Sequence, residues 1–89
     1  MIRREITIIN KLGLHARAAA KFAKAAGQFA CKVQVKNGGS AVDGKSVMSL
    51  MLLAASRGTV LEIVTDGDDE SAAMEYLAEL INKRFDEDE

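Results

Sequence analysis

The only histidine of the 89-residue chain, His15, lies in the segment Gly13-Leu14-His15-Ala16-Arg17, at the predicted start of a helix. Free backbone N–H groups in a first helical turn, with the positive end of the helix dipole behind them, favour a bound anion. Imidazole is a competent nucleophile near neutral pH, and the guanidinium of Arg17 can hold phosphate oxygens. These residues could therefore carry a phosphoryl group. The alternative is a surface histidine that only caps the helix.

Ser46 follows Asp43-Gly44-Lys45 and is predicted to open a second helix. An ordinary N-cap is the simpler interpretation of a serine in this place. A regulatory role is compatible with it, because a phosphate is electrostatically tolerated at a helix N-terminus.

The eight residues from Gly39 to Ser46 also satisfy the P-loop pattern. Their context argues against a nucleotide site, because Gly39 falls in a predicted hairpin turn and residues 40–42 are needed for a return strand. The chain is also too short for a nucleotide-hydrolysing α/β domain.

Alternating apolar residues predict strands over residues 2–9, 32–36 and 59–65, with a short return strand at residues 41 and 42 after the turn Asn37-Gly38-Gly39. Helical patterns cover residues 16–27, 46 to about 55, and 69–84. This βαββαβα order closes most simply as an antiparallel or mixed sheet with all helices on one face.

The second predicted helix, VMSLMLLAAS, is apolar nearly all round. One stripe can enter the core, namely Val47, Leu50, Leu53 and Ala54. That leaves Met48, Met51 and Leu52 without a core position. They would form an exposed, adaptable patch for partner proteins, unless the helix is more deeply buried than most.

Composition narrows the function classes. A chain of this length makes one domain, here residues 1–89, and four aromatic residues without Trp argue against RNA modules that stack bases. The single Cys31 excludes a disulfide framework and a Cys-based zinc site, and no metal or cofactor is predicted. With no signal peptide and no apolar run long enough for a bilayer, we expect a cytoplasmic protein.

The charge is strongly asymmetric along the chain. Residues 1–45 carry nine Lys or Arg and two acids, a net charge of +7, whereas residues 46–89 carry three and eleven, a net charge of −8. The basic half suits an acidic protein surface or a phosphate group, and no nucleic-acid motif accompanies it. The acidic ending at residues 86–89 is predicted to be a frayed, solvated tail.

Two segments at the right separation resemble HPr, the histidine-containing phosphocarrier family of the bacterial phosphoenolpyruvate-dependent phosphotransferase system. They are NKLGLHARAA at residues 10–19 and DGKSVMSLMLLA at residues 43–54. Length and element order agree as well, so the resemblance covers the whole chain. It implies an α+β open-faced β-sandwich, in which a four-stranded antiparallel sheet carries three helices on one face.

The resemblance also implies roles for particular residues. His15 would take a phosphoryl group on Nδ1 from phosphorylated enzyme I and pass it to a IIA component, with Arg17 and nearby N–H groups holding the phosphate. Ser46 would be the regulatory serine that an HPr kinase phosphorylates in hosts that have one. Partner docking would fall on Ala16, Arg17, Ala20, Lys24, Val47, Met48, Met51 and Leu52. The protein would be a monomeric carrier rather than an enzyme with its own turnover.

This sequence departs from the family at two places. Ala18 stands where the family usually has proline, and we expect little functional loss because alanine is a strong helix former. The acidic ending also differs from the common one. Two other functions stay open: a paralogue in the nitrogen-related regulatory branch, with the same chemistry, and, from another class, a small regulatory or RNA-binding βαβ-type domain.

Overall fold

A computed structural model describes residues 1–88 of the chain. The elements follow the predicted order βαββαβα and end in a short additional turn. Their bounds are β1 Ile2–Thr7, α1 Ala16–Gly27, β2 Lys32–Asn37, β3 Ser40–Asp43, α2 Val47–Leu52, β4 Val60–Asp66, α3 Glu70–Asn82 and η1 Arg84–Asp86.

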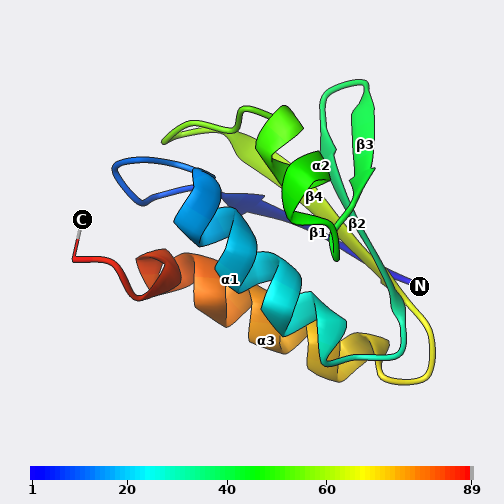
Figure 1. Ribbon diagram of the computed structural model, residues 1–89. Coiled ribbons are helices and arrows are strands. Elements are labelled where there is room, and N and C mark those ends of the chain that lie inside the picture. Colours follow the sequence, from blue (N-terminus) through cyan, green and yellow to red (C-terminus); the bar gives the residue numbers. More distant parts are fainter. Residues whose placement is uncertain (89) are drawn as a thin grey trace.

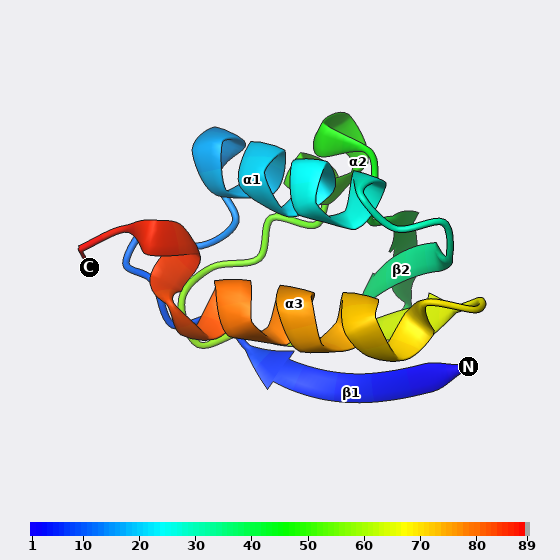
Figure 2. The same ribbon diagram turned by 90° about the horizontal axis from the view of Figure 1, so that it is seen from below.

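The four strands form one antiparallel sheet in the order β1-β4-β2-β3. The three helices cover one face of this sheet, and the other face is open (Figures 1 and 2). The predicted α+β open-faced sandwich is therefore confirmed. Helices α1 and α3 pack on each other, while α2 packs on α1 and on β3.

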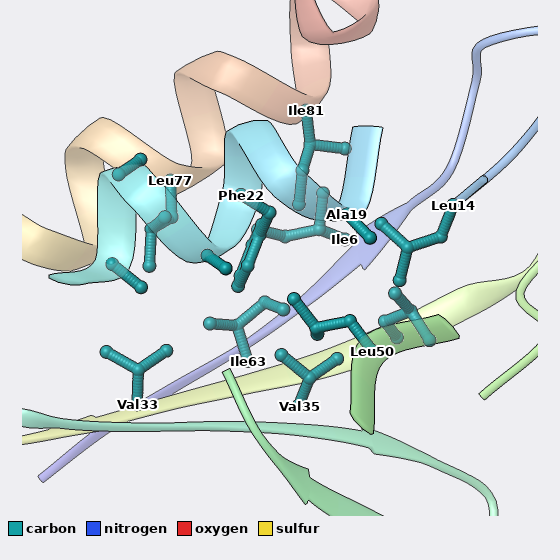
Figure 3. Close-up of a cluster of buried hydrophobic side chains, with 14 of the residues drawn as sticks. Ile6, Leu14, Ala19, Phe22, Val33, Val35, Leu50, Ile63, Leu77 and Ile81 are labelled. Carbon is teal, nitrogen blue, oxygen red and sulfur yellow. The ribbon is translucent and has the colours of Figure 1, made fainter. Parts of the chain in front are cut away.

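The core is mainly aliphatic and is packed around the aromatic ring of Phe22. Phe22 of α1 lies over Ile63 of β4, with Leu50 and Leu77 at its sides (Figure 3). All four are at most 2% exposed. Burial of a side chain of this size contributes about 1.5–3 kcal/mol, so α1 is fixed to the sheet mainly by its apolar stripe.

Helix α2 is shorter than predicted. It ends at Leu52 instead of about Ala55, because Ala54 adopts a left-handed conformation (φ 51°) and turns the chain away. The predicted core stripe of this helix is therefore half wrong. Leu50 and Leu53 are buried, but Ala54 is exposed and Val47 is 36% exposed, while Ala55 enters the core in their place.

The segment before Ser46 is a β-hairpin. Gly38 takes the positive φ of the turn (61°), and Ser40–Asp43 pairs with β2 as strand β3. A P-loop needs free backbone in this stretch to wrap phosphates, whereas here that backbone is paired in the sheet. Rejection of the P-loop match is thus confirmed.

The chain reverses after α3 through three consecutive residues with left-handed backbone, Arg84, Phe85 and Asp86, whose φ angles are 56°, 53° and 63°. Such a conformation is costly for residues with a Cβ, by about 1–2 kcal/mol each. It is offset here by Phe85, which is fully buried, and by Lys21 Nζ, which donates to the Phe85 carbonyl oxygen at 2.7 Å.

Over residues 1–88, no helix combines the length and apolar character needed to cross a bilayer.

Gly13, in the loop before α1, and Gly27, the last residue of α1, offer a matched pair of substitutions. A Cβ on Gly13, where φ is 67°, would lie 2.4 Å from the Ala55 carbonyl oxygen, whereas nothing lies within 4 Å of a Cβ on Gly27. We expect Gly13→Ala to lower the free energy of unfolding by more than about 2 kcal/mol through strain and steric overlap. Gly27→Ala should be neutral or stabilising by up to about 1 kcal/mol. Urea denaturation of both variants measures the difference, and equal stabilities would contradict this account of the loop.

Candidate functional site

His15 is the N-cap residue of α1, as predicted. Its backbone is extended (φ −77°, ψ −179°), and its carbonyl oxygen accepts the first helical hydrogen bond, from Ala19 N at 2.8 Å. The imidazole, however, makes no capping hydrogen bond to the first turn within the described part of the chain. The interpretation of His15 as a mere helix cap is therefore wrong, and the ring is directed elsewhere.

The loop before His15 is held from inside the protein. Asn10 is fully buried, and its Nδ2 donates to the Gly13 carbonyl oxygen at 2.8 Å. Leu14 is also buried, and its N–H donates to the Ala55 carbonyl oxygen at 2.8 Å. These two anchors fix the direction in which the chain enters α1 and so the position of His15.

Glu87 contacts the imidazole from the far end of the chain. Its Oε2 lies 2.5 Å from His15 Nε2, and its Oε1 accepts from Asn10 Nδ2 at 2.9 Å. The Glu87 side chain is only 11% exposed. The sequence predicts a solvated tail at residues 86–89, and for Glu87 that expectation is wrong, because the left-handed turn at η1 carries the chain back onto the active-site loop. Glu89 lies outside the described residues.

The Glu87 carboxyl is held in its charged form. Burial raises its pKa, but the hydrogen bonds from Asn10 and His15 and the nearby charges of His15 and Arg17 together outweigh burial. The resulting pKa lies below the ordinary range of a glutamate. An ionised carboxylate therefore sits against one nitrogen of the candidate nucleophile at neutral pH.

An open pocket surrounds these groups and extends from the loop before α1 to the tail. It is lined by Lys11, Leu12, His15, Ala16, Arg17, Asp86, Glu87 and Asp88. Arg17 also lines this pocket, and it is exposed in the first turn of α1. The structure thus brings together the imidazole, the guanidinium and the helix N-terminus that the sequence analysis selected.

The predicted docking residues of α1 and α2 lie exposed on neighbouring helices. Figures 1 and 2 show α1 and α2 side by side. Arg17 is exposed, and so are the seven other predicted docking residues, namely Ala16, Ala20, Lys24, Val47, Met48, Met51 and Leu52. Met48 and Leu52 are 76% and 82% exposed, so the alternative of a deeply buried second helix is wrong. Leu12, 66% exposed at the pocket, adds an apolar residue that the sequence analysis missed.

Ser46 is the N-cap of α2, as predicted. Its side-chain oxygen accepts from Ser49 N at 3.2 Å. The preceding Lys45 reaches the carbonyl oxygen of Phe29, beyond the C-terminal end of α1, at 2.7 Å. Because α1 is about 18 Å long, Ser46 lies toward the end of α1 opposite to His15.

The chain as a whole is similar to known proteins. Residues 2–83 match the family described as "PTS HPr component phosphorylation site". The chain is 60% identical over 86 residues to the phosphocarrier protein HPr of Pseudomonas aeruginosa, with 96% of each chain covered. The chain is also 55% identical to the HPr of Neisseria meningitidis over its full length. The chain belongs to the HPr family. It is a phosphocarrier protein of the phosphotransferase system rather than an enzyme.

The fold comparison agrees with the family assignment. The crystal structure of HPr-C-His from Thermoanaerobacter tengcongensis aligns with a TM-score of 0.96 and 39% identity, over 100% of both chains. Within this HPr fold, Ala18 is the third residue of α1 and fully buried. Its N–H is one of the first-turn groups for which a helix offers no acceptor, so a proline and an alanine both suit this position.

Sequence reasoning missed Asn10 and Glu87 as site residues. Asn10 opens the matching motif, which is a usable signal, but its role depends on its complete burial. Glu87 sits in a run of four acids and carries no signal of its own in the sequence. Only the reversal at η1 identifies it among its neighbours.

Proposed function

We propose that the chain is a cytoplasmic carrier that holds a phosphoryl group on Nδ1 of His15. It takes this group from phosphorylated enzyme I and delivers it to IIA components for sugar uptake. The observation that carries this proposal is the placement of a non-capping imidazole at the N-terminus of α1, beside Arg17. The ring nitrogen contacted by Glu87 is Nε2, so Nδ1 is the nitrogen available for attack.

The transfer exchanges one P–N or P–O bond for another. The Nδ1 lone pair forms a bond to phosphorus while the bond between phosphorus and the donor breaks, and the bonding electrons leave with the donor. Arg17 and the first-turn N–H groups of α1 would balance the charge on the phosphoryl oxygens. The grip is moderate because the group must leave again, and equally tight binding of every state would slow the onward step.

The docking surface of α1 and α2 supports recognition by more than one partner. Methionine side chains adapt to surfaces of different shape. Met48 and Met51 are exposed on α2, which packs next to α1, and the basic residues Arg17 and Lys24 of α1 are exposed as well. We infer that enzyme I and IIA present an apolar patch with acidic surroundings to this surface, and that the carrier acts as a monomer.

A role in the nitrogen-related regulatory branch is the second candidate function, because it would use the same histidine chemistry. The RNA-binding alternative is excluded by the family assignment. The two branches can be distinguished by their partners. In the sugar-transport branch, a purified sugar-specific IIA should discharge the phosphorylated carrier. In the nitrogen-related branch, only a regulatory IIA should discharge it.

The first test concerns the phosphoryl acceptor. His15→Ala should fold normally, because the imidazole is not part of the buried core. The variant should take no label from radioactive phosphoenolpyruvate and enzyme I. The native label should be lost in acid and survive base, as expected of a phosphoramidate. Mass spectrometry of the labelled protein locates the site. Labelling of the His15→Ala variant would contradict the proposal.

The second test concerns the docking surface. Met51 is 43% exposed, so Met51→Glu should change the melting temperature little and weaken enzyme I binding by on the order of tenfold or more. Val60→Glu is the matched control, since Val60 is 50% exposed on the strand next to β1 and alternates with the core-facing Leu61. Titration calorimetry with enzyme I should show loss of affinity for the first variant only. Equal affinities of the two variants for enzyme I would show that α2 is not part of the interface.

The third test concerns Ser46 as a regulatory site. A phosphate there adds nearly two negative charges next to the docking surface, while the helix N-terminus tolerates it. Because Ser46 lies toward the other end of α1 from His15, we expect the effect in docking rather than at the imidazole. Ser46→Asp should raise the KM for enzyme I severalfold and leave kcat and the melting temperature nearly unchanged. Unaltered kinetics of both this variant and the kinase-phosphorylated protein would leave Ser46 a structural cap.

A further inference from the structure

The two oxygens of Glu87 are engaged by two different donors on the active-site loop. Oε1 accepts from the buried Asn10, and Oε2 faces His15 Nε2. An ionised carboxylate can only accept hydrogen bonds, so the ring nitrogen facing it must carry a proton. In a neutral imidazole, a proton on Nε2 leaves the lone pair on Nδ1.

We propose that Glu87 is a positioning residue that holds the His15 proton on Nε2 and so keeps Nδ1 as the unprotonated, nucleophilic nitrogen. This inference rests on the proposed function, in which Nδ1 receives the phosphoryl group. It assigns a role to the acidic tail, which the docking surface and the phosphate contacts do not require.

The same contact stabilises the charge that develops during transfer. As Nδ1 bonds to phosphorus, its lone pair is used and the ring gains positive charge, with the proton still on Nε2. The carboxylate of Glu87 faces that proton and offsets the charge without any proton moving. When the group leaves, the electron pair of the N–P bond returns to Nδ1 and the ring is again neutral imidazole with its proton on Nε2.

Glu87 is held in place by the turn before it and by its own side-chain contact with Asn10. The buried ring of Phe85 and the bond from Lys21 to the Phe85 carbonyl oxygen fix the turn before it. Asn10, which also binds the Gly13 carbonyl oxygen, links Glu87 to the loop that sets the direction of His15. The buried side chain of Asn10 therefore helps to fix both the carboxylate and the loop that carries the imidazole.

Other charged groups face the same pocket and must be separated from Glu87 in any test. They are Lys11, Arg17, Asp86 and Asp88. Asp88 is exposed, so Asp88→Asn removes one negative charge from the pocket and serves as the matched control for Glu87→Gln. A glutamine offers one oxygen to two donors, and Glu87→Ala, which offers none, is the second variant.

The experiment combines a tautomer measurement with kinetics on the full chain. The ¹⁵N shifts of His15 report which ring nitrogen carries the proton, and stopped-flow mixing with phosphorylated enzyme I reports the transfer rate. We expect the wild type and Asp88→Asn to show the Nε2–H form. Glu87→Gln and Glu87→Ala should show a mixture of the two tautomers, with transfer slowed roughly threefold to tenfold at saturating enzyme I and an unchanged KM.

Two results would overturn the inference. One is an unchanged Nε2–H tautomer in Glu87→Ala, and the other is a wild-type transfer rate in that variant, whatever its tautomer. Neither touches the proposed function, which stands or fails on the labelling of His15. Conversely, label on the His15→Ala variant would remove the proposed function even if Glu87 controls the tautomer.

Discussion

The packing of α1 against the sheet determines where the chemistry of this protein takes place. Phe22 and the buried alanines of α1 lie on the core-facing strands, with α2 and α3 on either side. A helix fixed along its whole apolar stripe has a fixed N-terminus, so His15 at the N-cap inherits its position from the core. The aliphatic core, built without tryptophan, therefore defines the active-site geometry at the edge of the molecule.

Features that depend on local periodicity could be predicted from the sequence. The bounds of α1 agree at both ends because a run of helix formers ends at a glycine, and the β2–β3 hairpin follows from its Asn-Gly-Gly turn. The length of α2 could not be predicted, since apolar residues continue beyond Leu52. Its end is decided by the left-handed backbone of Ala54, which the contacts of Leu53 and Ala55 with the core impose.

The part of the site that joins distant segments was beyond sequence reasoning. His15 and Arg17 are two residues apart and belong to one helix start, so their spacing indicates a joint role. Glu87 is 72 residues from His15, and its approach depends on a left-handed turn of three residues that no glycine marks. The cost of that turn is offset by the buried Phe85, so the tail position is a tertiary effect and not a local preference.

The arrangement around His15 also explains how one site can both accept and release a phosphoryl group. Under the proposed function, Arg17 and the N-terminus of α1 would attract the incoming phosphoryl oxygens, while the carboxylate of Glu87, on the side of Nε2, would repel them. These opposed terms limit the net stabilisation of the phosphorylated state, whereas the attraction between Glu87 and the charged ring grows as the N–P bond forms. A carrier needs comparable free energies before and after transfer together with a low barrier between them. Under this proposal, the carboxylate of Glu87 would have two opposing effects on the phosphorylated state, because it offsets the ring charge that forms with the N–P bond and repels the phosphate oxygens. Their partial cancellation would keep the free energies before and after transfer comparable.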